Sequence, residues 1–237
     1  MLVFHAGTPF PLMDEDSYSY PEAQAHAERV DKWLGLQTER IENALVETGC
    51  RASAPNSTKD HQNLWIGLAT ESLLTPYVEI RGLLHFLKPK PSETVIDLGA
   101  AYGRVGIVIG HHYPQVQFIG YEFVGERLRE SQRLLGRLKY PNVRMEHADL
   151  ASKAFQPARA DYYFIYDYGK PAAIEKTLHD LRRFAENREI KVIARGPTCP
   201  TVIASRHKWL VKLEKCGRST VFVSRLHKEL TNAGKRN

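Results

Sequence analysis

The chain has little cysteine, no long apolar run and no recognisable secretion signal. Its three cysteines, Cys50, Cys199 and Cys216, are odd in number and far apart, which argues against a disulfide framework and against a zinc knuckle. No apolar run approaches the roughly 18 residues that a membrane helix needs. The N-terminus lacks the basic start, apolar middle and small-residue cleavage site of a secreted protein. We therefore expect a cytoplasmic protein with no membrane partner.

The common nucleotide-binding loops are also missing. No G-K-[ST] of a Walker loop occurs, and the glycine-rich turn at 99–103 reads Gly-Ala-Ala-Tyr-Gly, which is not the G-x-G-x-x-G of a nicotinamide site. Asp97 stands two residues before the first glycine of that turn. A carboxylate there would repel a pyrophosphate, but it can accept hydrogen bonds from a cationic amine.

Size and charge leave several partners open. The 237 residues, 43% of them hydrophobic, suffice for one sizeable core, or for one core with an appendage. The formal net charge of +6 is compatible with an acidic partner such as nucleic acid. The same charge also fits a basic protein that binds no nucleic acid. The sequence does not determine the oligomeric state.

The central part of the chain alternates between strand and helix patterns. Apolar strand segments occur at 94–99, 115–122, 142–149, 160–169 and 189–196, and amphipathic helical segments stand between most of them. Residues 209–226 read as two further strands around a turn, a hairpin. The pattern predicts an α/β fold with a doubly wound, mainly parallel seven-stranded sheet, a C-terminal antiparallel hairpin and a helical N-terminal extension.

The segment before the sheet is rich in helix formers. Residues 21–49 predict helix and 50–60 a loop, followed by a short helix, a break at Thr75-Pro76 and a second helix. We expect a helical cap or lid over 1–75, a Rossmann-like domain over 76–228 and a flexible basic tail over 229–237. Trp33 and Trp65 are expected to be core anchors, with substrate contact as the alternative.

Acidic residues end three successive strands. Asp97, Glu122 and Asp149 could serve as an acceptor for an ammonium, for two ribose hydroxyls and for an adenine amine, with the backbone of Ala148 and Leu150 beside the last. Each acid alone could be a strand-end or helix cap. Together, around a glycine-rich turn, they describe a ligand with no phosphate, as S-adenosylmethionine is.

These motifs resemble the class I, seven-stranded methyltransferases over roughly 75–226. "VIDLGAAYG", "GYE" and "HAD" stand where that family has its first three motifs, and "IYDY" where it has its segment after strand four. The family usually has glycine where this chain has Ala101. The resemblance implies S-adenosylmethionine as cofactor and the following binding residues: Asp97, Gly99, Ala101, Gly103, Glu122, Ala148, Asp149 and Leu150.

The methyl acceptor is less clearly indicated. The segment after strand four lacks the [DNS]-P-P-[YFW] of enzymes that methylate base amines, and it has no cysteine for C5-cytosine chemistry. Asp167 could receive a lysine ammonium, and Tyr168 could line an apolar channel that lowers the lysine pKa. We therefore take Asp167 and Tyr168 as candidate catalytic residues and expect a protein side chain, a lysine, as the acceptor.

A short upstream segment, "ESLLTPYVEIRGLLHFL", resembles the non-SET protein-lysine methyltransferases. That resemblance places Thr75 and Tyr77 against the methionine end of the cofactor. Thr75 could instead cap the helix that begins at Pro76. Two other functions stay open: an RNA methyltransferase, which the positive charge permits, and a non-catalytic cofactor-binding module. His111 and His112 are adjacent, so they cannot share one helix face, and we expect no metal.

Overall fold

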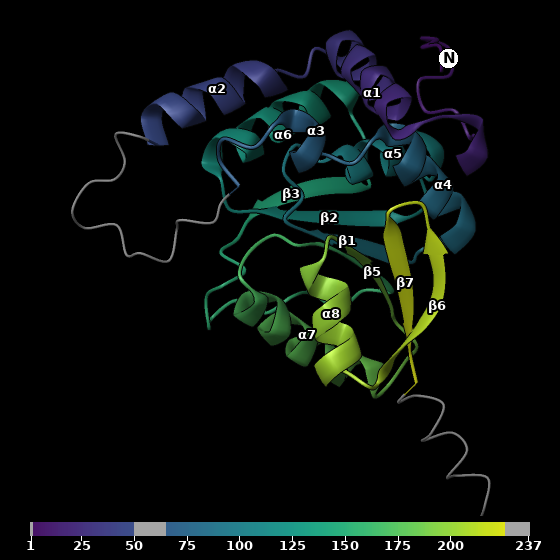
Figure 1. Ribbon diagram of the computed structural model, residues 1–237, viewed down its shortest axis with the longest axis vertical. Helices are drawn as coiled ribbons and strands as arrows, with labels where there is room; N and C mark the ends of the chain where they lie inside the picture. Colours follow the sequence, from purple (N-terminus) through teal and green to yellow (C-terminus); the bar gives the residue numbers. More distant parts are fainter. Residues whose placement is uncertain (1, 50–64, 226–237) are drawn as a thin grey trace, which may run out of the picture.

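The chain folds around one seven-stranded sheet with helices on both faces (Figure 1). The computed structural model describes residues 2–49 and 65–225. The strands lie in the order β3-β2-β1-β4-β5-β7-β6. Their bounds are β1 Thr94–Leu98, β2 Gln117–Glu122, β3 Val143–His147, β4 Tyr162–Tyr166, β5 Lys191–Arg195, β6 Leu210–Cys216 and β7 Ser219–Ser224.

The pairing of the strands confirms the expected fold class. Strands β3, β2, β1, β4 and β5 are parallel, whereas β7 is antiparallel to both β5 and β6. β1 pairs with β2 on one side and with β4 on the other, so the order of the strands reverses at β1. In open α/β sheets, ligands bind at the carboxyl ends of the strands beside such a reversal.

Side chains alternate between two cores, one on each face of the sheet. In β4, Tyr162 and Phe164 belong to one apolar cluster, and Tyr163 and Ile165 belong to the other. This period of two explains why the segment is apolar throughout, since both faces of a parallel sheet are covered. The first cluster packs under α1, α2, α4, α5 and α6, and the second under α7 and α8 (Figure 1).

The helices follow the predicted pattern with one addition. Pro200 lies in the first turn of α8, a helix that the sequence pattern does not predict. Pro76 is the N-cap of α4, and no side chain caps that helix, so the interpretation of Thr75 as its cap is wrong. The bounds are α1 Tyr20–Leu34, α2 Thr38–Gly49, α3 Thr70–Leu73, α4 Tyr77–Leu87, α5 Arg104–His112, α6 Gly125–Leu138, α7 Pro171–Ala185 and α8 Thr198–Arg206, with a short 3-10 turn at Glu15–Ser17.

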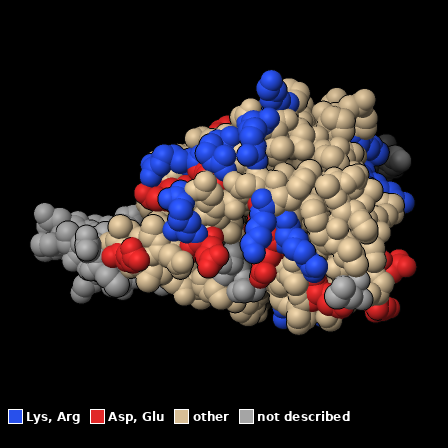
Figure 2. All heavy atoms as spheres, turned by 90° about the horizontal axis from the view of Figure 1, so that it is seen from above, with Lys and Arg blue, Asp and Glu red and all other residues tan. Residues whose placement is uncertain are grey.

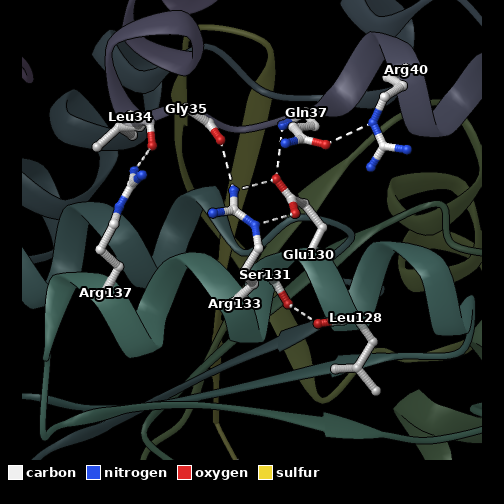
Figure 3. Close-up of polar contacts among 9 residues, drawn as sticks. All are labelled: Leu34, Gly35, Gln37, Arg40, Leu128, Glu130, Ser131, Arg133 and Arg137. Atoms are coloured by element: carbon white, nitrogen blue, oxygen red, sulfur yellow. Dashed lines mark hydrogen bonds and ion pairs between the residues drawn. The ribbon is translucent and has the colours of Figure 1, made fainter.

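Polar contacts from α6 hold the junction between α1 and α2. Arg133 Nη2 donates to the Gly35 carbonyl at 2.7 Å, and the Glu130 carboxylate accepts from the Gln37 N–H at 2.8 Å (Figure 3). Lys and Arg side chains gather on this helical face when it is seen from above (Figure 2). The N-terminal helices therefore pack on the sheet domain through both apolar and polar contacts, and the boundary near residue 75 stays a prediction.

Some expectations concern parts that the structure does not describe. Cys50, the loop over 50–60 and the tail over 229–237 lie outside the described residues. Cys199 and Cys216 are free thiols. In residues 2–49 and 65–225, no helix is both long and apolar enough to span a bilayer.

Candidate functional site

A cavity of about 1090 Å³ opens at the carboxyl ends of the central strands. Its lining includes Gly99 just after β1, Phe123 just after β2 and Asp167 just after β4. These three positions meet because the strands are parallel neighbours, so their ends share one edge of the sheet. The cavity is large enough for a cofactor of nucleoside size, since ligand pockets typically enclose about 300–1,000 Å³.

The turn after β1 holds three residues in the left-handed region. Gly99, Ala101 and Gly103 have φ angles of 87°, 46° and 76°. A side chain in this region costs roughly 1–2 kcal/mol, a cost that Ala101 carries and the two glycines avoid. The Ala101 N–H donates to the Glu122 carboxylate at 2.7 Å, a contact that fixes the turn.

At Gly99 the turn after β1 lies close to the loop after β4. A Cβ at Gly99 would lie 2.5 Å from the Tyr168 Cβ, so a side chain cannot fit unless the loop after β4 moves. Gly99→Ala should lower the free energy of unfolding by at least about 2 kcal/mol, because left-handed strain and overpacking add. Thermal and denaturant unfolding measure this loss.

Gly136→Ala is the matched control for that substitution. Gly136 lies inside α6, and a Cβ there meets nothing within 4 Å. We expect the control to be stabilised by about 0.5–1 kcal/mol, since alanine favours helix over glycine. Equal stability of Gly99→Ala and the unsubstituted protein would contradict the close contact with Tyr168.

Glu122 ends β2 as a buried carboxylate. One oxygen accepts from the Ala101 N–H, and the other accepts from the Val124 N–H at 2.7 Å. Burial raises the pKa of Glu122, and the backbone N–H groups and the Arg127 cation partly offset that rise. Each carboxylate oxygen has a further lone pair with which to accept from a ligand hydroxyl.

Asp97 is buried at the end of β1, next to Glu122. Burial, and after it the charge of Glu122, raise the pKa of Asp97 to about 7. Asp97 does not line the large cavity; it lines a smaller one of about 50 Å³ that shares Gly99 and Ala101 with it. Among the described residues Asp97 forms no ion pair, and a buried carboxylate of this kind is a costly arrangement that a bound ammonium would relieve.

The third acidic position lies after β3. Asp149 and Leu150 line the large cavity, whereas Ala148 is buried and is not part of its lining. The Ala148 N–H donates to the Glu122 carbonyl at 3.0 Å, and the Asp149 carboxylate accepts from the Ala151 N–H at 3.0 Å. The structure thus brings Glu122 and Asp149 to one cavity.

Asp167 lines the cavity, but its carboxylate is bound to α8. The two oxygens accept from the N–H groups of Thr198 and Cys199, both at 2.8 Å. A carboxylate is well placed at a helix N-terminus, where N–H groups are unpaired and the dipole is positive. The φ angle of Asp167 is 24°, which shows that its backbone is constrained to this geometry. The arrangement suits a residue that positions the loop after β4.

Tyr168 lies in the same loop and also lines the cavity. Its hydroxyl lies 2.6 Å from Thr177 Oγ1 and donates to the Ala173 carbonyl at 3.2 Å, so α7 fixes the ring. Burial is the main cause that raises the pKa of Tyr168. The hydroxyl is therefore neutral at physiological pH.

Thr75 and Tyr77 lie outside the large cavity. The Tyr77 hydroxyl donates to Asp31 at 2.7 Å, and the ring lies under the Arg104 guanidinium, 4.9 Å from its centroid. Arg104 also pairs with Asp31 and donates to the Thr75 carbonyl at 3.1 Å. Thr75 lines only the smaller cavity beside Asp97. In this region Ser72 and Leu73 are the residues that line the large cavity.

The structure adds Trp65 and Arg127 to the site. Trp65 is 40% exposed, and Trp33 is 47% exposed, so the expectation of two core anchors is wrong. Trp65 Nε1 donates to the Asp167 carbonyl at 2.7 Å, and Arg127 Nη2 donates to the Trp65 carbonyl at 3.3 Å. Trp65 therefore bridges two sides of the cavity.

Phe123 is another cavity residue that the sequence reasoning did not select. It directly follows Glu122 and stacks on His147, with ring centroids 5.5 Å apart. The position of Phe123 directly after Glu122 is the sequence feature that could have indicated its place at the cavity. Among the described residues, no group of three His, Cys, Asp or Glu side chains could hold a metal ion.

Comparison with known proteins gives one related sequence and a shared fold. No protein-family model matches the chain. Ribosomal RNA small subunit methyltransferase G of Porphyromonas gingivalis (strain ATCC BAA-308 / W83) is 31% identical over 125 residues, which are 53% of this chain and 49% of that protein. The chain thus spans about half the length of the curated relative it matches.

A solved structure has the same architecture. Precorrin-6y C5,15-methyltransferase from Geobacter metallireducens GS-15 superposes with a TM-score of 0.51 at 15% identity, over 70% of this chain and 95% of that one. At this identity the likeness concerns the fold alone. The seven-stranded sheet with its antiparallel C-terminal pair is the Rossmann-like fold of class I methyltransferases.

Proposed function

We propose that this protein is an S-adenosylmethionine-dependent methyltransferase that acts on RNA. The observation that carries the proposal is the cavity at the strand ends, with Glu122 and Asp149 in or beside it and Asp97 behind its glycine-rich turn. These acids match an amine-bearing nucleoside that has no phosphate. The related ribosomal RNA enzyme supports the same activity.

The cavity residues divide according to the parts of such a cofactor. Glu122 would accept from the ribose hydroxyls, Asp149 from the adenine amine, and Phe123 would pack on the adenine ring. Asp97 would supply the negative charge for the ammonium of the methionine part. When bound, the sulfonium of S-adenosylmethionine supplies an electrophilic methyl group. The protein residues bind and orient it, and they keep bulk water away from the reaction.

Four observations favour RNA over lysine as the acceptor. The lysine hypothesis requires Asp167 to receive an ammonium, but both oxygens of Asp167 already accept from the N-terminus of α8. The related sequence is a ribosomal RNA enzyme, and the net charge of +6 suits a polyanionic substrate. The half-exposed indole of Trp65 at the cavity offers a surface on which a base can stack.

The proposal predicts transfer of labelled methyl groups to RNA. Purified protein, incubated with methyl-tritiated S-adenosylmethionine and with separate pools of ribosomal RNA, transfer RNA and total protein, should label an RNA pool. The label should be sensitive to ribonuclease and resistant to protease. Label that only protease removes would restore the lysine hypothesis. Cofactor binding by calorimetry without label in any pool would identify a non-catalytic module instead.

A further inference from the structure

A second hollow lies on the other helical layer, next to the cofactor cavity. This groove, between α7 and the end of α8, has a volume of about 410 Å³. Ala172 and Lys176 line both hollows, so the groove is continuous with the cavity mouth. α7 and α8 lie side by side below the sheet (Figure 1). The lining also includes Glu175, Arg182, Arg206, His207 and Trp209.

His207 gives the groove an unused hydrogen-bond donor. The Trp209 Nε1–H donates to His207 Nδ1 at 3.2 Å, and because an indole N–H can only donate, Nδ1 must be the acceptor. The proton of the neutral ring therefore sits on Nε2. Nε2 is buried and has no hydrogen-bond partner among the described residues. Burial, the largest cause, lowers the pKa of His207, which keeps the ring in this neutral, donating form.

Arg182 gives the groove an uncommitted cation. Two other cations of the lining are engaged: Lys176 donates to Asp180 at 2.8 Å, and Arg206 pairs with Glu175. In the described part of the chain, the exposed guanidinium of Arg182 makes no hydrogen bond or ion pair. One acid, Glu175, lines the groove, and its charge is balanced by Arg206. The groove thus offers a net positive charge to a ligand.

The opposite helical face is less suited to an anionic ligand, although it carries many basic side chains (Figure 2). Arg133 there is bound to Glu130 and to the Gly35 carbonyl (Figure 3), and Arg129 pairs with Glu126. These cations serve the docking of the N-terminal helices, or they pair on their own helix. The α7–α8 groove combines a free cation with a buried, unpartnered donor.

We propose that the α7–α8 groove binds a backbone phosphate of the RNA substrate, next to the nucleotide that enters the cofactor cavity. This inference rests on the proposed RNA methyltransferase function. Arg182 would donate to the phosphate oxygens, and His207 Nε2–H, which is buried in the lining of the groove, would give a further hydrogen bond once the ring turns toward the ligand. Phosphate contacts of this kind fix the register of a nucleic acid and carry no sequence information.

Arg182→Gln tests the groove, with Arg183→Gln as its neighbour and matched control. Arg183 carries the same charge on the same helix, but it stacks on Phe184 and contacts Gln156 outside the groove. Binding of a fluorescent single-stranded RNA is measured against salt. Arg182→Gln should weaken binding about 5- to 10-fold at 0.1 M salt and reduce the slope of log K against log salt by about 0.7. Arg183→Gln should change neither quantity, and cofactor affinity should stay constant in both variants.

The results distinguish a failure of the groove proposal from a failure of the proposed RNA methyltransferase function. Equal losses in both variants would mean that only overall charge matters, which overturns the groove and leaves the methyltransferase proposal intact. No RNA binding by the unsubstituted protein would overturn the proposed function itself. Titration with inorganic phosphate, followed by the ¹⁵N signals of the histidine rings, tests a free-anion site. A shift at His207 together with unchanged RNA binding in Arg182→Gln would assign the groove to a small anion and overturn the RNA role.

Discussion

Asp97→Asn is expected to bind S-adenosylmethionine about 10- to 100-fold more weakly than the unsubstituted protein at pH 8, because a hydrogen bond to a charged partner contributes about 1.5–3 kcal/mol. Asparagine keeps the size of the side chain and removes its charge. Asp97 is buried beside the glycine-rich turn, so water cannot stabilise the ligand ammonium in place of the missing carboxylate. Calorimetric titration at pH 8 measures the difference.

The difference in cofactor affinity between Asp97→Asn and the unsubstituted protein should become small at acidic pH. The pKa of Asp97 is raised to about 7, and only the ionised form attracts an ammonium. Below that pKa the ionised fraction falls about tenfold per pH unit, so the affinity of the unsubstituted protein should fall between pH 7 and pH 5. At pH 5 it should approach the affinity of Asp97→Asn. Glu122, whose pKa is also raised, titrates in both proteins and does not remove this convergence.

Asp16→Asn provides the control for the change in net charge. Asp16 is exposed in the short 3-10 turn, away from the lining of either cavity. Its affinity and pH profile should match those of the unsubstituted protein. Two results would show that the ammonium is held elsewhere. One is normal cofactor binding by Asp97→Asn at pH 8. The other is an affinity ratio between the two proteins that stays constant down to pH 5.

The sheet could be predicted from the sequence because its signals are local. β1 and β4 are apolar runs that end in an acid or a turn, and the segments between the strands are amphipathic. The turn at 99–103 follows β1, Glu122 is the last residue of β2, and Asp149 comes shortly after β3, so parallel pairing alone brings them to one edge. The order of the strands and helices along the chain therefore predicts the position of the cavity.

The roles of individual side chains depend on contacts across long sequence separations, which no local pattern reveals. Asp167 is an acid in the right loop, but the helix that occupies its carboxylate begins at Thr198 and is not predicted. Tyr77 follows a plausible loop, yet its hydroxyl is bound to Asp31 on α1. The lysine hypothesis depended on an Asp167 carboxylate free to face a substrate, and the resemblance behind it placed Tyr77 against the methionine end of the cofactor.

The N-terminal helices are expected to be essential for stability, because a buried ion pair joins α2 to the cofactor domain. Glu42 on α2 accepts from Arg127 Nε at 2.8 Å and from Nη2 at 2.9 Å, and the Tyr102 hydroxyl donates to it at 2.7 Å. Glu42 and Arg127 are both buried. Tyr102 belongs to the glycine-rich turn, and Arg127 lines the cavity. The cluster therefore connects the cap to both sides of the proposed cofactor site.

Glu42→Ala should lower the free energy of unfolding by about 3–5 kcal/mol, since it removes the carboxylate that accepts two hydrogen bonds from the buried Arg127 guanidinium. Glu126→Ala, which breaks the exposed pair with Arg129, should change that free energy by less than about 1 kcal/mol. The double variant Glu42→Met with Arg127→Leu should recover much of the loss, because both charges are removed together. Denaturant unfolding distinguishes these cases. A double variant as unstable as Glu42→Ala would mean that packing of the α2 side chain, and not the loss of the charge pair, accounts for the lower stability.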